Sequence, residues 1–237
     1  MHKSLFLALL VSGAALAEDG WNGAGELGLA LTRGNSETES LNAKLGLSFE
    51  DAAWKHNIGF AALRQKGEVG GSEELELTAN RYELSGSSAY SLSERSYLIG
   101  SLRYENDDFA PYDYQTVASF GAGWFAIKND VTEWLFEGGP GYRRVKEVAS
   151  GESDGQAVFR GRMAYKHAFN ASTSFENTLL VEAGSDNTFA QNDSGLSVKM
   201  NASLALKAGL QFRHNSDVAP GLKKTDSLFT TNLVYAF

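Results

Sequence analysis

Apolar and polar residues alternate along almost the whole of this chain, and the alternation limits the folds that it can adopt. In the stretch VFRGRMAYKHAF, Phe159 and Tyr165 lie on one face, while Arg160 and Arg162 lie on the other. A period of two is typical of a β-strand, because successive side chains of a strand point to opposite sides. Beyond the N-terminal segment there is no run of 18 or more apolar residues, so a membrane-spanning helix is not expected. The pattern predicts an all-β chain.

Turn signals divide the chain into twelve alternating segments. Tight connections, such as DAA after Glu50 and NAS at 201–203, alternate with longer polar ones, such as DNTFAQND from Asp186 and SDVAPGLKKTD from Ser216. Tight turns at one rim and longer loops at the other are typical of bacterial outer-membrane barrels, and an even strand number brings both termini to the periplasmic rim. We therefore predict an antiparallel transmembrane β-barrel of about 12 strands. The expected strands are 21–33, 39–50, 54–66, 75–90, 95–106, 114–128, 132–146, 155–169, 173–186, 194–201, 205–216 and 225–237.

The N-terminal segment has the form of a secretory signal. Lys3 precedes an apolar run from Leu5 to Val11, and small residues ending in Ala17 follow. The expected domains are a cleaved signal peptide at 1–17 and an outer-membrane β-barrel at 18–237. The chain has no cysteine, which excludes disulfides and cysteine-based sites. Its net charge of −8, without a basic cluster, argues against a nucleic-acid partner. No metal site and no cofactor are expected.

Aromatic residues gather near both ends of the expected strands. A bilayer has two interfaces, and barrels carry an aromatic girdle at each of them. A girdle at the tight-turn rim is expected from Trp21, Trp54, Trp124, Trp134, Tyr235 and Phe237. A second set near the long loops consists of Tyr104, Tyr112, Tyr114, Tyr142, Phe189 and Phe212.

The chain ends on the strand-like sequence TTNLVYAF, with Phe237 as its last residue. A closed barrel has no free edge, so the last strand is expected to pair with the first. The ending resembles the C-terminal signature by which outer-membrane barrels are recognised for insertion. Asn232 stands where that signature often has glycine. We therefore expect the barrel-assembly machinery as a partner, together with outer-membrane lipid and lipopolysaccharide. Asp107, Asp108 and Asp113 are candidates for bridging lipopolysaccharide through divalent ions.

The inward faces of the expected strands are charged. Cations and anions occur there in similar numbers, so they can pair across a narrow lumen. This favours a narrow passive channel for small ions or solutes, or an envelope-structural barrel whose salt-bridged interior conducts little. The stripe of Arg160, Arg162 and Lys166 is the most cationic part and is a candidate for contact with an anionic solute. The expected lumen-lining residues are Lys44, Arg103, Glu105, Glu133, Glu137, Arg160, Arg162, Lys166, Glu176, Glu182, Lys207 and Arg213.

Two other classes of protein remain open. His214 and Ser216 have the His-x-Ser spacing of outer-membrane phospholipase, which is also a twelve-strand barrel, so a lipid-modifying hydrolase is one alternative. His214 is expected on the inward face, however, and no catalytic constellation is predicted. The other alternative is a soluble periplasmic ligand-binding barrel, for which two aromatic girdles would have no explanation.

Two passages disturb the alternation. The apolar parity slips between Leu77 and Tyr82, which predicts a β-bulge or a loop end. Pro140 removes a backbone donor from a strand that should have neighbours on both sides. A bulge at Pro140, or a position above the membrane, is therefore expected.

Three long stretches resemble the YdiY-like, salt-induced outer membrane protein family, which carries a domain of unknown function. They are RGNSETESLNAKLGLSFE, RYELSGSSAYSLSERSYLIGSLRYENDDFAPYDYQTVASFGAGW and RHNSDVAPGLKKTDSLFTTNLVYAF. The similarity runs from about Gly23 to Phe237. It implies a location in the outer membrane and a link to salt or acid stress. The family has no established catalytic residues, so the resemblance implies none here.

Overall fold

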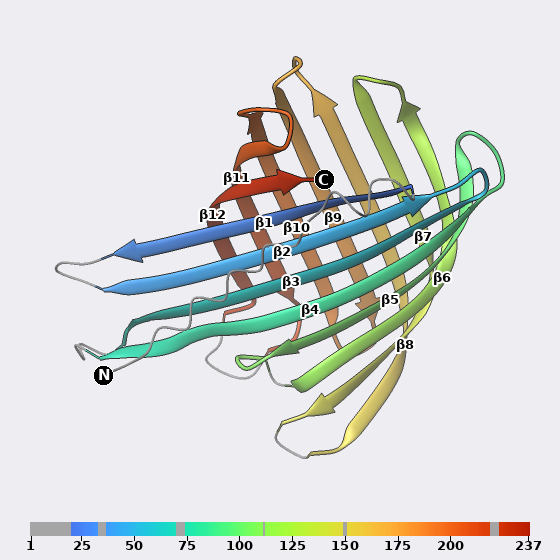
Figure 1. The fold of residues 1–237 in the computed structure, drawn as a ribbon. Helices are drawn as coiled ribbons and strands as arrows, with labels where there is room; N and C mark the ends of the chain where they lie inside the picture. Colours follow the sequence, from blue (N-terminus) through green and yellow to red (C-terminus); the bar gives the residue numbers. More distant parts are fainter. Residues whose placement is uncertain (1–19, 33–36, 70–73, 111, 149–150, 219–222) are drawn as a thin grey trace.

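The computed structural model describes residues 20–32, 37–69, 74–110, 112–148, 151–218 and 223–237, and the expected signal peptide at 1–17 lies outside them. Within these ranges, twelve antiparallel strands form a closed barrel in which each strand pairs with its neighbours in sequence and the last pairs with the first (Figure 1). The predicted fold class is confirmed. The strands are β1 (Trp21–Thr32), β2 (Thr38–Glu50), β3 (Trp54–Glu68), β4 (Leu75–Ser91), β5 (Ser96–Asp107), β6 (Tyr112–Lys128), β7 (Thr132–Glu147), β8 (Ser153–Ala168), β9 (Thr173–Gly184), β10 (Thr188–Lys199), β11 (Leu204–Asn215) and β12 (Thr225–Ala236).

One turn chemistry closes the tight-turn rim five times. In each turn, a side-chain oxygen accepts hydrogen bonds from the backbone N–H groups two and three residues further on, as in an Asx turn. At Asn201, for example, both bonds measure 2.9 Å. The residues in this position are Asp51, Ser93, Asn129, Asn170 and Asn201. The short polar sequences that predicted the tight turns therefore act through their side chains.

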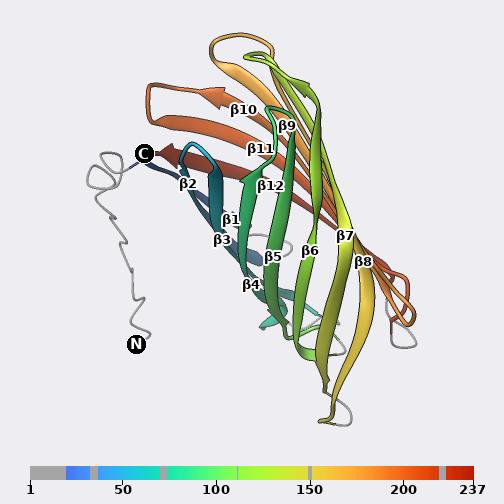
Figure 2. The ribbon, with the colours of Figure 1, turned by 90° about the vertical axis from the view of Figure 1, so that its right-hand side faces the viewer.

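The outer face of the barrel is apolar, and the interior holds the charges. Leu29, Phe120 and Phe229 are 64%, 60% and 70% exposed, whereas the carboxylates of Glu105 and Glu182 are fully buried. A water-soluble protein shows the reverse arrangement, but a wall that faces hydrocarbon is expected to look like this. Figure 2 shows β5–β8 side by side as one long curved part of this wall.

No helix in the described part of the chain is both long and apolar enough to cross a bilayer.

Aromatic side chains lie along the tight-turn rim. Trp54 and Trp124 are exposed on the outer face, and Trp54 packs against Tyr90 with ring centroids 5.0 Å apart. At the C-terminus, the rings of Tyr235 and Phe237 lie 6.0 Å apart. Trp21 and Trp134 likewise contact neighbouring rings, those of Phe49 and Tyr165 among others.

The second aromatic set divides between the two faces. The rings of Tyr104 and Tyr114 lie 5.9 Å apart, and Tyr142 and Phe212 are exposed. Tyr112 and Phe189, in contrast, are buried, Phe189 completely. Their expected place in the girdle is wrong, because both rings pack against charged groups inside the barrel rather than against lipid.

The start of β10 differs most from the prediction. The sequence predicted a long loop over DNTFAQND and a strand from 194, but β10 begins at Thr188 and only 185–187 connect it to β9. Polar residues occupy both faces of this segment: Asp193 points into the barrel, whereas Asn192 and Ser194 lie on the other face and accept hydrogen bonds from Asn177 of β9. A strand with polar residues on both faces resembles a loop in sequence, which explains the error.

Of the two irregularities predicted from the sequence, one is confirmed and the other is wrong. In β4, the register against β3 shifts between the pairs Gln65–Ala79 and Lys66–Leu77, so Thr78 is the extra residue of the predicted bulge. The bulge expected at Pro140 is wrong, because β6 and β7 keep one register on both sides of it.

Beside Pro140, two residue pairs of the β6–β7 ladder are missing, and the two backbones are in close contact instead. A Cβ on Gly139 would lie 2.5 Å from Gly121 Cα, and a Cβ on Gly121 would lie 2.8 Å from the carbonyl carbon of Gly138. The glycines thus allow β6 and β7 to continue side by side where proline offers no N–H.

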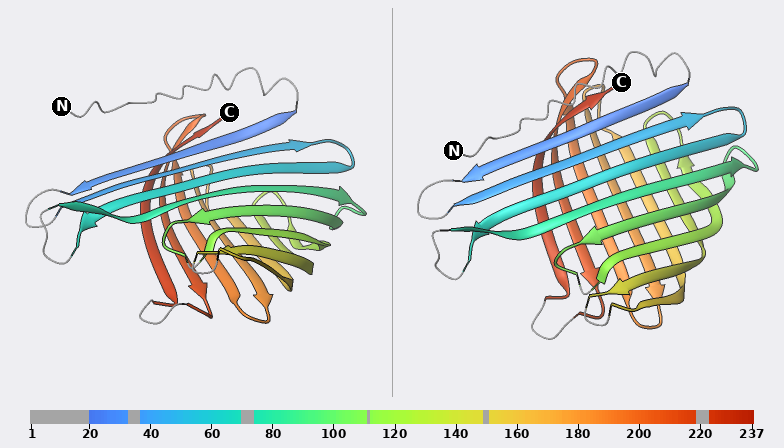
Figure 3. Two further views of the ribbon diagram at one scale, coloured as in Figure 1. Left: turned by 90° about the horizontal axis from the view of Figure 1, so that it is seen from below. Right: turned by 60° about the horizontal axis from the view of Figure 1, so that its bottom comes forward.

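β1 and β12 close the barrel through a short ladder. Ala24–Leu27 pair in register with Leu233–Ala236, and Gly23 and Phe237 exchange two backbone hydrogen bonds of 2.8 and 2.9 Å. Within the described ranges, neither β1 beyond this ladder nor β12 before it has a register partner across the seam, and the two strands diverge there (Figure 3). β3 and β4, by comparison, are paired along the whole of Trp54–Glu68.

Candidate functional site

Four charged side chains meet inside the barrel near the rim that carries the longer loops. Arg103 Nε donates a hydrogen bond to Glu182 Oε1 at 3.2 Å, and Arg103 Nη1 donates to Glu105 Oε2 at 3.0 Å. Arg213 Nη2 donates to the same oxygen of Glu105 at 2.7 Å. β5, β9 and β11 supply these residues close to their loop-side ends. We call the four residues the ion cluster.

The ion cluster is almost completely removed from solvent. Arg103 and Arg213 are 6% exposed, and both glutamates are 0% exposed. Phe189 of β10 packs against both guanidinium groups, with its ring centroid 4.8 Å from Arg103 Cζ and 5.0 Å from Arg213 Cζ. Such cation–π contacts are most favourable where water is excluded.

Further polar side chains seal the ion cluster from the side. Tyr112 donates a hydrogen bond to Glu105 Oε1 at 3.2 Å. Arg143, which is 1% exposed, donates to the backbone carbonyls of Glu182 and Asn187 at 2.8 Å each. The part of the lumen beside β5–β11 is therefore filled at this level.

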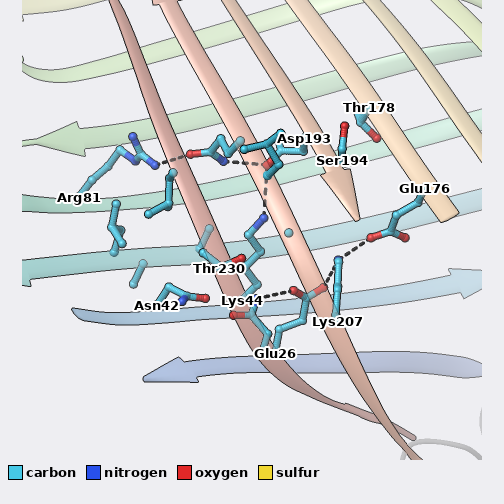
Figure 4. Close-up of a pocket in the computed structure, with 18 residues that line it drawn as sticks. Glu26, Asn42, Lys44, Arg81, Glu176, Thr178, Asp193, Ser194, Lys207 and Thr230 are labelled. Atoms are coloured by element: carbon cyan, nitrogen blue, oxygen red, sulfur yellow. Dashed lines mark hydrogen bonds and ion pairs between the residues drawn. The ribbon is translucent and has the colours of Figure 1, made fainter. Parts of the chain in front are cut away.

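A polar cavity of about 300 Å³ lies inside the barrel, toward the tight-turn rim from the ion cluster (Figure 4). β1–β4 contribute to it from one wall, and β9–β12 from the other. Its lining holds equal numbers of opposite charges, so the cavity is formally neutral. The cations are Lys44, Arg81 and Lys207, and the anions are Glu26, Glu176 and Asp193.

The charges of the cavity pair across the barrel. Lys207 Nζ lies 2.6 Å from Glu26 Oε1 and also pairs with Glu176. Lys44 Nζ lies 3.4 Å from Asp193 Oδ1, a longer and weaker pair. Figure 4 shows these two groups of charges on either side of the open space.

A third charged group centres on Glu137 of β7. Arg162 Nη1 donates to Glu137 Oε1 at 3.1 Å, Tyr97 donates to it at 2.8 Å, and Arg160 Nη1 lies 3.6 Å from Oε2. The expected cationic stripe is thus balanced by a carboxylate at two of its three residues. Lys166, the third, lies further along β8.

The structure divides the twelve expected lumen residues among these places. Glu133 and Lys166 are register partners at the tight-turn ends of β7 and β8, both are exposed, and no ion pair joins them in the described structure. The ion cluster holds Arg103, Glu105, Glu182 and Arg213; the cavity holds Lys44, Glu176 and Lys207; the third group holds Glu137, Arg160 and Arg162.

Several residues that lie inside the barrel were not predicted from the sequence to line the lumen. Arg81 and Arg143 follow the inward parity of their strands, but the neighbouring bulge in β4 and Pro140 in β7 made that parity uncertain. Phe189 and Asp193 lie in the segment taken for a loop. A strict count of inward positions back from Lys199 would have found both.

The alternative catalytic pair is not assembled. His214 Nδ1 lies 2.8 Å from Thr225 Oγ1, whereas Ser216 Oγ donates to Asn187 Oδ1 at 3.2 Å and accepts from Thr188 N at 2.8 Å. His214 lies on the outer face, next in sequence to the inward Arg213, so its expected inward position is wrong.

The acidic residues near the longer loops have partners within the protein. No group of three or more His, Asp or Glu residues with metal-binding geometry occurs in the described ranges. Asp107 pairs with Arg213 at 3.6 Å inside the barrel, and Asp113 pairs with Lys146 at 2.9 Å. Asp108 accepts a hydrogen bond from Asn80 at 2.6 Å, so each of the three carboxylates already has a partner.

The apolar outer wall, the charged interior and the closed ring of twelve strands define a barrel of the outer-membrane type. Residues 25–237 match the family described as "Protein of unknown function, DUF481", and the chain belongs to this family. It is 24% identical over 204 residues to the uncharacterized protein YdiY of Escherichia coli (strain K12), covering 86% of this chain and 78% of that protein. The resemblance to a YdiY-like family is confirmed.

Solved structures with a similar fold are outer-membrane barrels. The COG4313 outer membrane channel from Pseudomonas putida F1 has a TM-score of 0.54 at 11% identity, covering 92% of this chain and 95% of that one. The NanC porin has a TM-score of 0.53 at 10% identity, covering 91% and 98%. The translocator domain of autotransporter NalP from Neisseria meningitidis has a TM-score of 0.51 at 12% identity, covering 95% and 94%. At these identities the likeness concerns the fold.

Proposed function

We propose that this protein is a narrow, non-enzymatic channel of the Gram-negative outer membrane whose resting lumen is closed by the ion cluster. The observation that carries the proposal is the pairing of Arg103 with Glu182 and of Arg213 with Glu105 across the interior, with both carboxylates fully buried. The apolar outer face and the fold shared with porins and channels support the location.

The charged side chains of the ion cluster favour a lumen that can open. Buried ion pairs cost desolvation energy, and well-packed apolar side chains often stabilise a protein equally well. A permanently sealed lumen would therefore need no charges. Charged side chains, once separated, remain compatible with a water-filled pore, whereas an apolar plug would resist wetting.

Planar-bilayer conductance tests the proposal. We expect the unmodified protein to be mostly silent. The double variant Arg103→Ala/Glu182→Ala removes one charge of each sign and should give discrete current steps. The matched control is Lys55→Ala/Glu50→Ala, which removes an exposed pair with an N–O distance of 2.9 Å beside a tight turn, and it should remain silent.

Two results would contradict a gated channel. Steady current through the unmodified protein, at the level of the double variant, would mean that the ion cluster does not close the lumen. Silence of a correctly folded double variant would instead support an envelope-structural role.

We also propose that the protein acts in the response to salt or acid stress, as the YdiY-like resemblance implies. Deletion of its gene should then reduce growth in high sodium chloride more than in sucrose of equal osmolality. Equal growth of both strains in salt and at low pH would argue against this role.

The expected partners remain part of the proposal. The lipid-facing wall would contact outer-membrane lipid and lipopolysaccharide, and the C-terminal strand would be recognised by the barrel-assembly machinery after export with a cleaved signal peptide. Fractionation of the membranes, with N-terminal sequencing of the mature chain, tests location and cleavage together.

A further inference from the structure

The unpaired part of the β1–β12 seam forms one side of the polar cavity. Leu228, Thr230 and Asn232 line the cavity from the part of β12 that precedes the ladder. Glu26 and Asn42 line it from β1 and β2. An unpaired strand edge is unfavourable in hydrocarbon and is tolerated where it borders a polar space. The cavity provides such a space directly behind the seam.

Two buried oxygens at the seam have no hydrogen-bond donor in the described structure. They are Oδ1 of Asn42 and Oδ1 of Asn232, in residues that are 8% and 2% exposed. Asn232 Nδ2 donates to Glu26 Oε2 at 3.1 Å, which sets the orientation of this amide. A buried acceptor without a donor is unfavourable, so a ligand that brings N–H groups would be stabilised here.

The charges of the cavity suit a ligand that carries both signs. The most accessible cation is Lys44, with 41% of its side chain exposed, and the most accessible anion is Glu176, with 49% exposed. The lining as a whole is neutral, so it offers no net attraction to a simple anion or cation. A zwitterion can satisfy both groups at once.

The outer surface beside the seam is apolar. Leu29 of β1 and Phe229 of β12 are among the most exposed apolar side chains, and Leu27 and Leu233 flank the end of the ladder with about half of their surface exposed. Acyl chains would pack against these residues. The ion cluster lies on the loop side of the cavity, and the seam lies between the cavity and these lipid-facing side chains.

We propose that the β1–β12 seam is a lateral portal that admits the headgroup of a zwitterionic phospholipid into the cavity. The phosphate would face Lys44, and the ammonium would face Glu176 and donate to the free oxygen of Asn42. The acyl chains would remain outside, against Leu29 and Phe229.

Native mass spectrometry of the full barrel, released from detergent micelles, tests the site. The probes are dioleoyl phosphatidylethanolamine, dioleoyl phosphatidylglycerol and free phosphoethanolamine. We expect retention of phosphatidylethanolamine with an affinity about tenfold above that of phosphatidylglycerol, and weaker retention of the free headgroup. Lys44→Glu should lower retention about tenfold, whereas the control Lys55→Glu should not change it.

Two results of this experiment would overturn the proposal. Equal retention of the two lipids, or equal effects of Lys44→Glu and Lys55→Glu, would mean that the cavity does not bind the headgroup selectively. Binding of free phosphoethanolamine as tight as that of the lipid would indicate a site for a soluble solute, without a portal.

A reversible disulfide tests the route. The chain has no cysteine, so Leu29→Cys/Thr231→Cys introduces a single pair, at positions that would be partners if the register of the ladder continued. Oxidation should block uptake of phosphatidylethanolamine, and reduction should restore it. The control is Leu45→Cys/Phe60→Cys, two register partners of the complete β2–β3 ladder. Uptake that is the same in the oxidised seam variant and in the oxidised control would exclude entry through the seam.

The proposal of a lipid site and the proposal of a channel can be disproved independently of each other. Lipid retention is measured without current, and both Lys44 and the seam lie outside the ion cluster. A barrel that never conducts can still bind the lipid, and a conducting barrel can lack the site.

Discussion

Arg103 of β5 holds the carboxylate of Glu182, 79 residues later on β9, through hydrogen bonds from Nε and Nη2. Both side chains are buried, and the bidentate geometry is the one in which guanidinium and carboxylate groups bind most strongly. This pair joins walls of the barrel that are not adjacent in the sheet, which is the contact that the proposed closure of the lumen requires.

Removing one partner of this pair should be more harmful than removing both. Arg103→Met leaves Glu182 buried without its main partner, and such a loss costs about 3–5 kcal/mol of unfolding free energy. The double variant Arg103→Met/Glu182→Leu should recover most of this loss. Urea unfolding in liposomes measures the four members of the cycle. Purely additive losses would contradict a direct pair, and Lys55→Ala/Glu50→Ala should stay within about 1 kcal/mol of the unmodified protein.

The contact between β6 and β7 depends on glycine at Gly139. A methyl group there would lie 2.5 Å from Gly121 Cα and against the carbonyl of Phe120. Gly139→Ala should therefore destabilise the barrel by about 1–3 kcal/mol. Gly100→Ala is the matched control, because a Cβ at Gly100 meets nothing within 4 Å. Equal unfolding midpoints of the two variants would show that the strands can separate without cost.

The tight turn after β2 should respond to acid. Backbone hydrogen bonds from Ala53 and Trp54, at 2.8 Å each, lower the pKa of Asp51 below its ordinary value. The ionised form stabilises the folded turn, so this contribution is present above the unfolded-state pKa and is lost as the pH falls through the lower folded-state pKa.

Carbon NMR titration of the Asp51 carboxyl group measures this pKa directly. Asp51→Asn keeps an oxygen acceptor for both N–H groups, so the turn should persist and its local pH dependence should vanish. An Asp51 that titrates at the ordinary value of an exposed aspartate would contradict the hydrogen-bonded turn.

The C-terminal residue should control closure of the seam. Phe237 exchanges two backbone hydrogen bonds with Gly23, and its ring occupies the space where a Gly23 side chain would be. Gly23→Val should displace the ring, and Phe237→Ala should remove its packing. Because the β1–β12 ladder is short, both changes should lower the fraction of folded barrel. The shift in electrophoretic mobility between unheated and heated samples measures this fraction. Ala236→Ser, at an exposed neighbouring position, is the control.

Much of the fold could be predicted from local sequence. The alternation that places Phe159 and Arg160 on opposite faces requires only the geometry of a strand, and the side-chain oxygen of Asn201 closes its turn through bonds to residues two and three positions away. These are short-range properties, so the strand number, the tight turns and the inner and outer faces follow from the chain itself. The bulge at Thr78 also left a local trace in the parity.

The tertiary structure alone decided which charges meet. Lys207 pairs with Glu26 over 181 residues and Lys44 with Asp193 over 149, and no local pattern specifies such distances. Phe189 resembled a loop residue because its strand has polar residues on both faces, and the ladder at the seam is short because β1 and β12 diverge beyond Leu27. Alternation fixes only the direction in which a side chain points; the register and tilt of all twelve strands together decide what it meets across the lumen.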